Sequence, residues 1–161
     1  TLTFLCPIKG PAAKEYLHAL SFGTVQEETI DAFIEWSSEN IDFIRELGGE
    51  VEVCPPGPTF PKFRGSETMM RYQVKGKEGE LGGRLYGVAL WPCLLNTQGG
   101  PKRSPRGEIV DVWGRIIKRL YGAGELGSIW GFLYQSGGNL GECLASGRMA
   151  GLRAASEPPV C

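Results

Sequence analysis

Histidine is almost absent from this chain, and its scarcity limits the chemistry that the sequence can support. His18 is the only histidine among 161 residues, and it lies between Leu17 and Ala19 without an acidic or cysteine neighbour. A Cys-His or Ser-His-Asp enzyme would depend entirely on this one imidazole. The sequence therefore argues against that class and favours a structural role for His18.

Paired cysteines are also missing. The sequence has an odd number of cysteines and no C-x-x-C spacing; they are Cys6, Cys54, Cys93, Cys143 and Cys161. This pattern argues against a disulfide framework and against a zinc site, so we expect no metal. Cys143 lies in an apolar helical pattern, which predicts a small buried residue.

The chain also lacks a large excess of charge of one sign, and it lacks long apolar runs. The formal net charge is -1, which gives no electrostatic reason to expect nucleic acid or an anionic membrane as a partner. The apolar runs are much shorter than the roughly 18 residues that a spanning helix needs. The first residues do not read as a basic-then-apolar secretion signal. We therefore expect a cytoplasmic globular protein with no membrane and no nucleic-acid partner.

Glycine, by contrast, is abundant. The chain has 24 glycines in 161 residues, about twice the usual ~7%, and they concentrate after residue 76. They alternate with Trp, Tyr, Leu and Ile rather than forming a low-complexity tract. This arrangement indicates ordered backbone that passes close to a planar ligand or another strand.

The N-terminal half predicts one long helix over residues 24–47. Thr24 and Glu27 have the spacing of a capping box, apolar residues recur at helical spacing, and Gly48-Gly49 provides a stop. A short strand over residues 50–53 follows. Polar, glycine-rich residues 75–84 then predict a linker between a first unit, 1–74, and a second, 85–161.

The C-terminal half predicts three strands and a helix. Strands are expected over 85–91, 108–112 and 115–121, with Trp113-Gly114 as the hairpin turn between the last two. The helix is expected over 139–155. One side of it carries only small residues, which would let a partner backbone approach closely: Gly147, Ala150, Gly151, Ala154 and Ala155.

A literal G-x-G-x-x-G occurs at Gly122-Ala-Gly-Glu-Leu-Gly127, directly after the 116–121 strand. This fingerprint binds a pyrophosphate only when its third glycine begins a helix and an acidic residue ends a second strand about 20 positions later. Gly131 interrupts any helix after Gly127, and position 147 lies inside the expected second helix. We therefore interpret the match as fortuitous.

The same region nevertheless resembles a flavin-binding segment of another kind. The stretch from Leu120 to Ala155 is similar to the C-terminal segment of the FAD-dependent fumarate reductase/3-ketosteroid dehydrogenase family. Asn96-Thr-Gln-Gly-Gly100 is similar to that family's Thr-x-Gly-Gly, and the hairpin over 108–121 extends the likeness. Residues 11–73 look like the start of the family's substrate-capping domain.

The resemblance implies an α+β fold: a fragment of a flavin-binding domain, made of a hairpin, a glycine-rich loop and a helix, plus part of a helical cap. The cofactor would be FAD. The family's own βαβ pyrophosphate-binding unit has no counterpart in this sequence, so the chain is expected to be a truncated or partial member. Another chain or a further segment would then supply that unit.

The resemblance also assigns the cofactor residues. Glu125 matches the acid that hydrogen-bonds the ribityl chain, and the alternative is a solvated loop carboxylate. The helix start beneath the isoalloxazine ring would stabilise negative charge on reduced flavin, although ordinary capping by Asn139 gives the same pattern. The full set expected to bind FAD is Gly99, Gly100, Ala123, Gly124, Glu125, Gly137, Asn139 and Leu140.

The expected substrate follows from two further positions. Dicarboxylate reductases of the family carry a His and an Arg where this chain has Asn96 and Gln135, so fumarate is not expected. Tyr134, four residues before Gly138, resembles the ketosteroid dehydrogenases, in which such a Tyr hydroxyl and Gly amide polarise a ketone. Tyr134 and Gly138 are thus the expected catalytic pair, and a buried core tyrosine is the alternative.

Two functions remain open from the sequence. The first is hydride transfer between flavin and an enone or ketosteroid-like carbonyl substrate. The second is a catalytically inactive remnant that serves as a structural or protein-interaction domain.

Overall fold

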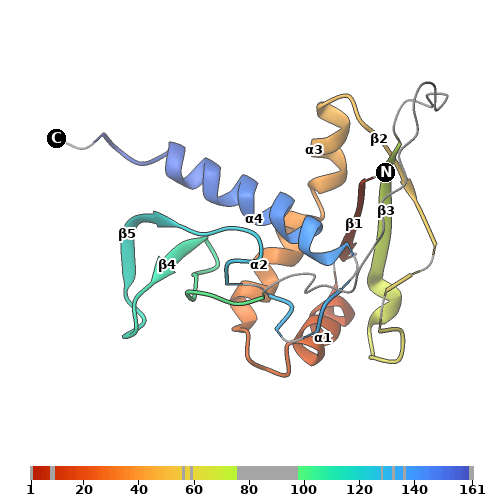
Figure 1. The fold of residues 1–161 in the computed structure, drawn as a ribbon, viewed down its shortest axis with the longest axis horizontal. Coiled ribbons are helices and arrows are strands. Elements are labelled where there is room, and N and C mark those ends of the chain that lie inside the picture. Colours follow the sequence, from red (N-terminus) through yellow and green to blue (C-terminus); the bar gives the residue numbers. More distant parts are fainter. Residues whose placement is uncertain are drawn as a thin grey trace, which may run out of the picture.

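The computed structural model describes residues 2–7, 10–55, 57–58, 60–75, 98–127, 129–131, 133–135 and 137–159. It mixes helices and strands, in agreement with the α+β class (Figure 1). In chain order the elements are β1 (Leu2–Pro7), α1 (Pro11–Leu20), α2 (Glu27–Ser37), α3 (Asn40–Glu46), β2 (Glu50–Val53), the short 3-10 helix η1 (Ser66–Thr68), β3 (Met69–Lys75), β4 (Glu108–Val110), β5 (Ile116–Tyr121) and α4 (Gly138–Ala155).

An antiparallel sheet in the order β1-β3-β2 occupies one end of the molecule. Phe4 pairs with Tyr72 across β1 and β3, and Val53 pairs with Tyr72 from the other side. The sequence predicted β2 but neither β1 nor β3. Lys75, the expected first residue of the linker, is the last residue of β3, and the strand predicted over 85–91 lies outside the described residues.

The single helix predicted over 24–47 is wrong, because the structure has two helices there. The hydroxyl of Ser38 donates to the carbonyl of Glu35 (2.7 Å), a local bond that competes with helix continuation. The predicted capping box is also absent: Gln26 is the N-cap residue, and the Thr24 hydroxyl donates to the Ser21 carbonyl instead (2.6 Å).

The hairpin and the last helix are confirmed. β4 and β5 pair antiparallel, and the Asp111 carboxylate accepts from the amides of Trp113 and Arg115 (both 2.9 Å), which fixes the turn. α4 begins one residue before its predicted start and ends at the predicted Ala155. Figure 1 shows α4 running from the β1-β3-β2 sheet to the hairpin at the opposite end.

One core joins the two predicted units. Apolar side chains of α1 and α2 pack with Trp130 and with Ala145 of α4, and the Phe33 and Trp130 rings meet edge to face at 5.5 Å between centroids. Two buried hydrogen bonds also connect the units: Asn40 Nδ2 donates to the Gly141 carbonyl (3.1 Å), and Gln135 Nε2 donates to the Tyr16 hydroxyl (2.6 Å). The described residues of 1–74 and those of 85–161 therefore form one packed body.

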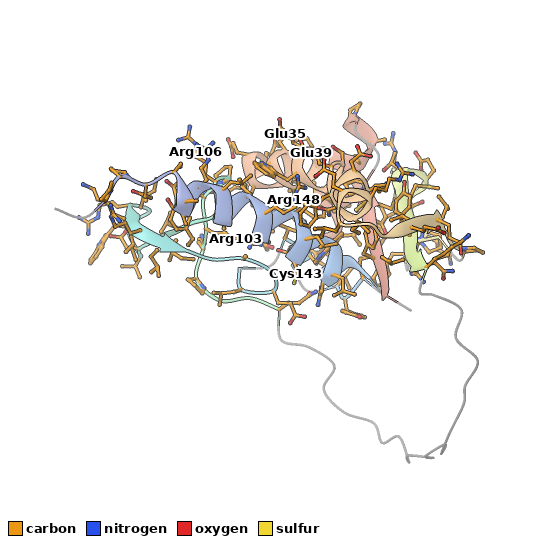
Figure 2. The ribbon with its side chains drawn as sticks, turned by 90° about the horizontal axis from the view of Figure 1, so that it is seen from above. Glu35, Glu39, Arg103, Arg106, Cys143 and Arg148 are labelled. Carbon is orange, nitrogen blue, oxygen red and sulfur yellow. The ribbon has the colours of Figure 1, made fainter. Side chains whose placement is uncertain are left out.

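Arg148 connects α4 to α2 and α3. Its guanidinium lies over the rings of Trp36 and Phe43, at 5.6 and 4.9 Å, and donates to the Glu39 carboxylate at 2.9 Å. Figure 2 shows Arg148 and Glu39 on neighbouring elements. These contacts fix the direction of α4, whose N-terminal end carries the candidate site. Within the described residues, no helix has the length and apolarity needed to cross a bilayer.

Candidate functional site

Two glycine-rich segments lie against each other at the centre of the expected cofactor site. The Gly127 amide donates to the Gly99 carbonyl (2.8 Å), and the Gly99 amide donates to the Glu125 carbonyl (3.4 Å). Gly99 and Gly100 have φ angles of 132° and 120°, which favour glycine. A Cβ on Gly100 would also lie 2.8 Å from Leu126 Cδ1. Glycine therefore permits the close approach of these two loops.

Side chains extend this contact to the start of α4. Asn139 Nδ2 donates to Glu125 Oε1 at 2.6 Å, and Gln98 Nε2 donates to Asn139 Oδ1 at 3.1 Å. The structure thus brings together Gly99, Glu125 and Asn139, which the sequence analysis placed at the flavin. One bond from Asn139 leaves the Glu125 carboxylate further acceptor capacity, because an ionised carboxylate has about four lone-pair sites.

The loop that carries Glu125 is fixed against α4. The Gly124 amide donates to the buried Ser146 hydroxyl (2.8 Å), and a Cβ on Gly124 would lie 2.8 Å from Cys143 Sγ. Ala123 is exposed beside it. Cys143 is itself exposed, so its expected burial is wrong. Among the described residues no helix begins between Gly127 and α4, in agreement with our rejection of the literal dinucleotide fingerprint.

The start of α4 departs from the expected oxyanion-binding geometry. Gly137 is the N-cap residue with φ 80°, and Gly138 packs so closely on Trp130 that a Cβ would lie 2.9 Å from the indole ring. The Gly138 amide donates to the Gln135 carbonyl at 2.7 Å. In this conformation the amide is therefore engaged within the chain, which corrects the expectation that it is available to a substrate ketone. Leu140, two residues further along the helix, is 40% exposed.

Tyr134 and Gln135 face different surroundings although they are neighbours in sequence. Tyr134 is 36% exposed, so the alternative reading of a buried core tyrosine is wrong. Gln135 is completely buried and donates to the Tyr16 hydroxyl. Burial raises the pKa of Tyr16, and the hydrogen bond from Gln135 lowers it by a smaller amount. The pKa of Tyr16 is therefore raised. Gln135 therefore acts in the core and not as a ligand-binding group.

A buried ion pair beneath the two loops was missed by the sequence analysis. Arg103 donates to the Glu142 carboxylate, and the two side chains are 3% and 0% exposed. The Ile129 amide donates to Glu142 Oε1 (3.0 Å), and Arg103 Nη1 donates to the Gly122 carbonyl (3.3 Å). Figure 2 shows Arg103 beside α4. The pair therefore holds the two glycine-rich segments against the helix.

A pattern in the sequence points to this carboxylate. Glu142 shares one face of α4 with Ala145, Ser146 and Met149, all of which are buried. The spacing i, i+3, i+4, i+7 predicts that the first member is buried too. A buried carboxylate requires a cation or several donors, and Arg103 meets that requirement.

A cleft of about 210 Å³ opens beside the Gly99–Gly100 turn. It lies between the Gly99–Gly100 segment and the start of α2. The lining comes from the residues around the N-terminus of α2 and from the two glycine-rich segments: Thr24, Val25, Gln26, Thr29, Gln98, Gly99, Gly100, Pro101, Lys102, Arg103, Gly127 and Gly131. Gln98 belongs both to this cleft and to the bond with Asn139. The cleft is therefore adjacent to the Glu125–Asn139 contact.

Comparison with known proteins gives no independent assignment. No model of a known protein family matches the chain, and neither a curated protein nor a solved structure matches it.

Proposed function

We propose that the chain is the C-terminal flavin-binding part of an FAD-dependent oxidoreductase of the fumarate reductase/3-ketosteroid dehydrogenase type, in which hydride passes between flavin and an enone or ketosteroid-like carbonyl substrate. The observation that carries the proposal is the contact between Glu125 and Asn139 at 2.6 Å, with Gly99 bonded to the same loop. These residues come from three separate segments that the resemblance assigned to one cofactor.

The chemistry of this group suits a flavin. Glu125 would accept hydrogen bonds from the ribityl hydroxyls, and Asn139 at the start of an 18-residue helix lies where the helix dipole favours negative charge on the reduced ring. FAD, when bound, supplies the hydride-accepting ring. Tyr134, at the surface, would donate its hydroxyl to the substrate carbonyl. The pyrophosphate-binding unit would come from another segment or chain.

Riboflavin tests this proposal directly, because it has the ring and the ribityl chain but no pyrophosphate. Amide shifts in a ¹H–¹⁵N correlation spectrum should map to Gly99, Glu125 and Asn139 and should weaken in Glu125→Gln. Glu157→Gln, which changes a carboxylate two residues beyond the C-terminal end of α4, is the matched control. Saturable shifts that avoid these three amides would refute the flavin site.

FAD itself should bind the isolated chain weakly, since nothing in the sequence supplies the βαβ cradle for its adenine half. A fluorescence titration measures this affinity. Sub-micromolar binding by the monomer would contradict the expected dependence on a further unit.

An interaction domain without catalysis is the second candidate, and the hairpin favours it. Val112 and Trp113 are 89% and 76% exposed at the turn, and Ile116 and Leu120 of β5 are about half exposed. Exposed apolar groups of this kind on one projecting element are typical of a protein contact. Failure of riboflavin to bind, together with a partner that protects the hairpin amides from exchange, would favour this function.

We also propose a cytoplasmic location. Cys6, Cys54 and Cys143 are free thiols in the structure, as expected for a reducing compartment. Fractionation of the native cells tests this location.

A further inference from the structure

The cleft beside the Gly99–Gly100 turn has a lining whose charged members are all cations. Lys102 and Arg103 belong to it, and its other lining residues are uncharged. The chain as a whole carries a net charge of -1, so this local excess of positive charge is not a property of the whole surface. A cationic cleft raises the local concentration of anions.

Only one of the two cations has charge to offer a ligand. Arg103 is neutralised by Glu142 within the core. Lys102 is exposed, and among the described residues its ammonium group forms neither an ion pair nor a hydrogen bond. Lys102 is therefore the group in this cleft that is able to bind an anion.

Uncharged donors complete the lining. Thr29 comes from α2, Gln26 is the N-cap residue of that helix, and Gln98 donates to Asn139. The volume of about 210 Å³ accommodates a small organic group rather than a macromolecule. A cleft with apolar walls at Val25 and Pro101 and one cation suits an apolar body that carries a single negative charge.

We propose that this cleft binds a carboxylate through Lys102, and that the carbonyl substrate of the proposed function carries one such group. The carboxylate site stands on the cleft alone, whereas its assignment to the substrate rests on the proposed function. One ammonium group balances one carboxylate. The expected ligand is therefore a monocarboxylate with an apolar body.

Benzoate and its uncharged amide, benzamide, form a matched pair of probes for the isolated chain. Benzoate should give saturable shifts of the Gly99, Gly100 and Gly127 amides, and benzamide should bind about fivefold more weakly, the scale of one partly exposed ion pair. Lys102→Gln should lower benzoate affinity by the same factor of about five. Lys118→Gln, an exposed lysine on β5 outside the cleft, should leave it unchanged.

Three results would overturn the carboxylate site: equal affinities for benzoate and benzamide, unchanged affinity in Lys102→Gln, or no saturable shift up to about 10 mM benzoate, beyond the millimolar range of weak specific sites. The riboflavin titration separates this proposal from the proposed function. Lys102-dependent benzoate binding without riboflavin binding would uphold the carboxylate site and refute its assignment to a flavoenzyme substrate.

Discussion

Arg103 and Glu142 form an ion pair from which water is excluded, although the two residues lie 39 positions apart in the chain. Arg103 follows the Gly99–Gly100 turn, and Glu142 lies one turn after Asn139 on α4. The pair thus determines how far the glycine-rich loop lies from the helix. Its removal should affect both folding and the geometry of the candidate site.

Glu142→Gln should destabilise the protein by about 3–5 kcal/mol, because it leaves the Arg103 guanidinium buried without a compensating charge. Urea unfolding followed by circular dichroism measures the change. Glu39→Gln, which breaks the half-exposed pair with Arg148, should cost at most about 1 kcal/mol. The double variant Arg103→Met/Glu142→Leu should recover much of the loss, and equal losses for all three variants would contradict the argument.

Tyr134→Phe should change catalysis without changing stability. Tyr134 is 36% exposed, so loss of its hydroxyl should shift Tm by less than about 2 °C. In a complete flavoenzyme, loss of one donor to the substrate oxygen should lower turnover roughly 100-fold. Tyr72→Phe, on β3, is the control and should leave turnover unchanged. A lowered Tm with unchanged turnover would remove Tyr134 from the site.

The buried thiol of Cys6 should make the free energy of unfolding fall at alkaline pH. Burial raises the pKa of its thiol to about 12 from an ordinary 9.0, with a smaller opposing effect of the Asn40 hydrogen bond. Between these values the unfolded chain releases the thiol proton while the folded chain keeps it, so the free energy of unfolding falls as pH rises. One such group gives a slope of up to about 1.4 kcal/mol per pH unit.

Urea unfolding between pH 9 and about 12, the window that these two pKa values define, tests this prediction. Cys6→Ala creates a small cavity at every pH but should abolish part of the slope. Cys54→Ala removes a half-exposed thiol and should keep the slope. Identical slopes in the wild type and Cys6→Ala would contradict the assignment.

Gly65→Ala should destabilise the packing of η1 on α1. Gly65 has φ 82°, and an added Cβ would lie 1.9 Å from the Ala12 carbonyl oxygen. The strained dihedral alone costs about 1 kcal/mol, and the backbone clash adds to it. Gly57→Ala, in open space, is the matched control and should be neutral or slightly stabilising. Thermal unfolding compares them, and equal Tm values would refute the predicted clash.

The elements that the sequence predicted correctly are those specified by neighbouring residues. The β4–β5 hairpin depends on a local turn around Trp113, and α4 on a glycine-to-helix boundary at Gly138. The strands β1 and β3 depend on pairing between residues 62 to 72 positions apart, from Pro7 with Met69 to Leu2 with Val74. β3 does carry an alternation that could have revealed it, since apolar Met70, Tyr72 and Val74 alternate with polar Arg71, Gln73 and Lys75. β1, with the sequence Leu-Thr-Phe-Leu-Cys-Pro, lacks such a regular alternation.

The candidate site also combines residues that the sequence analysis assigned with contacts that it did not predict. The resemblance assigned Glu125 and Asn139 to one cofactor, but it did not predict their hydrogen bond, because no local pattern places a loop carboxylate against a helix start. The engagement of the Gly138 amide by Gln135 depends on how the preceding turn packs on Trp130. That packing is tertiary, so residue types and spacing did not predict it.

The core shared by α1, α2 and α4 has a consequence for synthesis of the chain on the ribosome. Tyr16 and Asn40 find their buried hydrogen-bond partners at Gln135 and Gly141, which are translated 119 and 101 residues later. Until those residues emerge, the apolar faces of the first two helices have only part of their covering. The nascent chain therefore exposes apolar surface for most of its translation. Chaperones that bind such surface have a long interval in which to act.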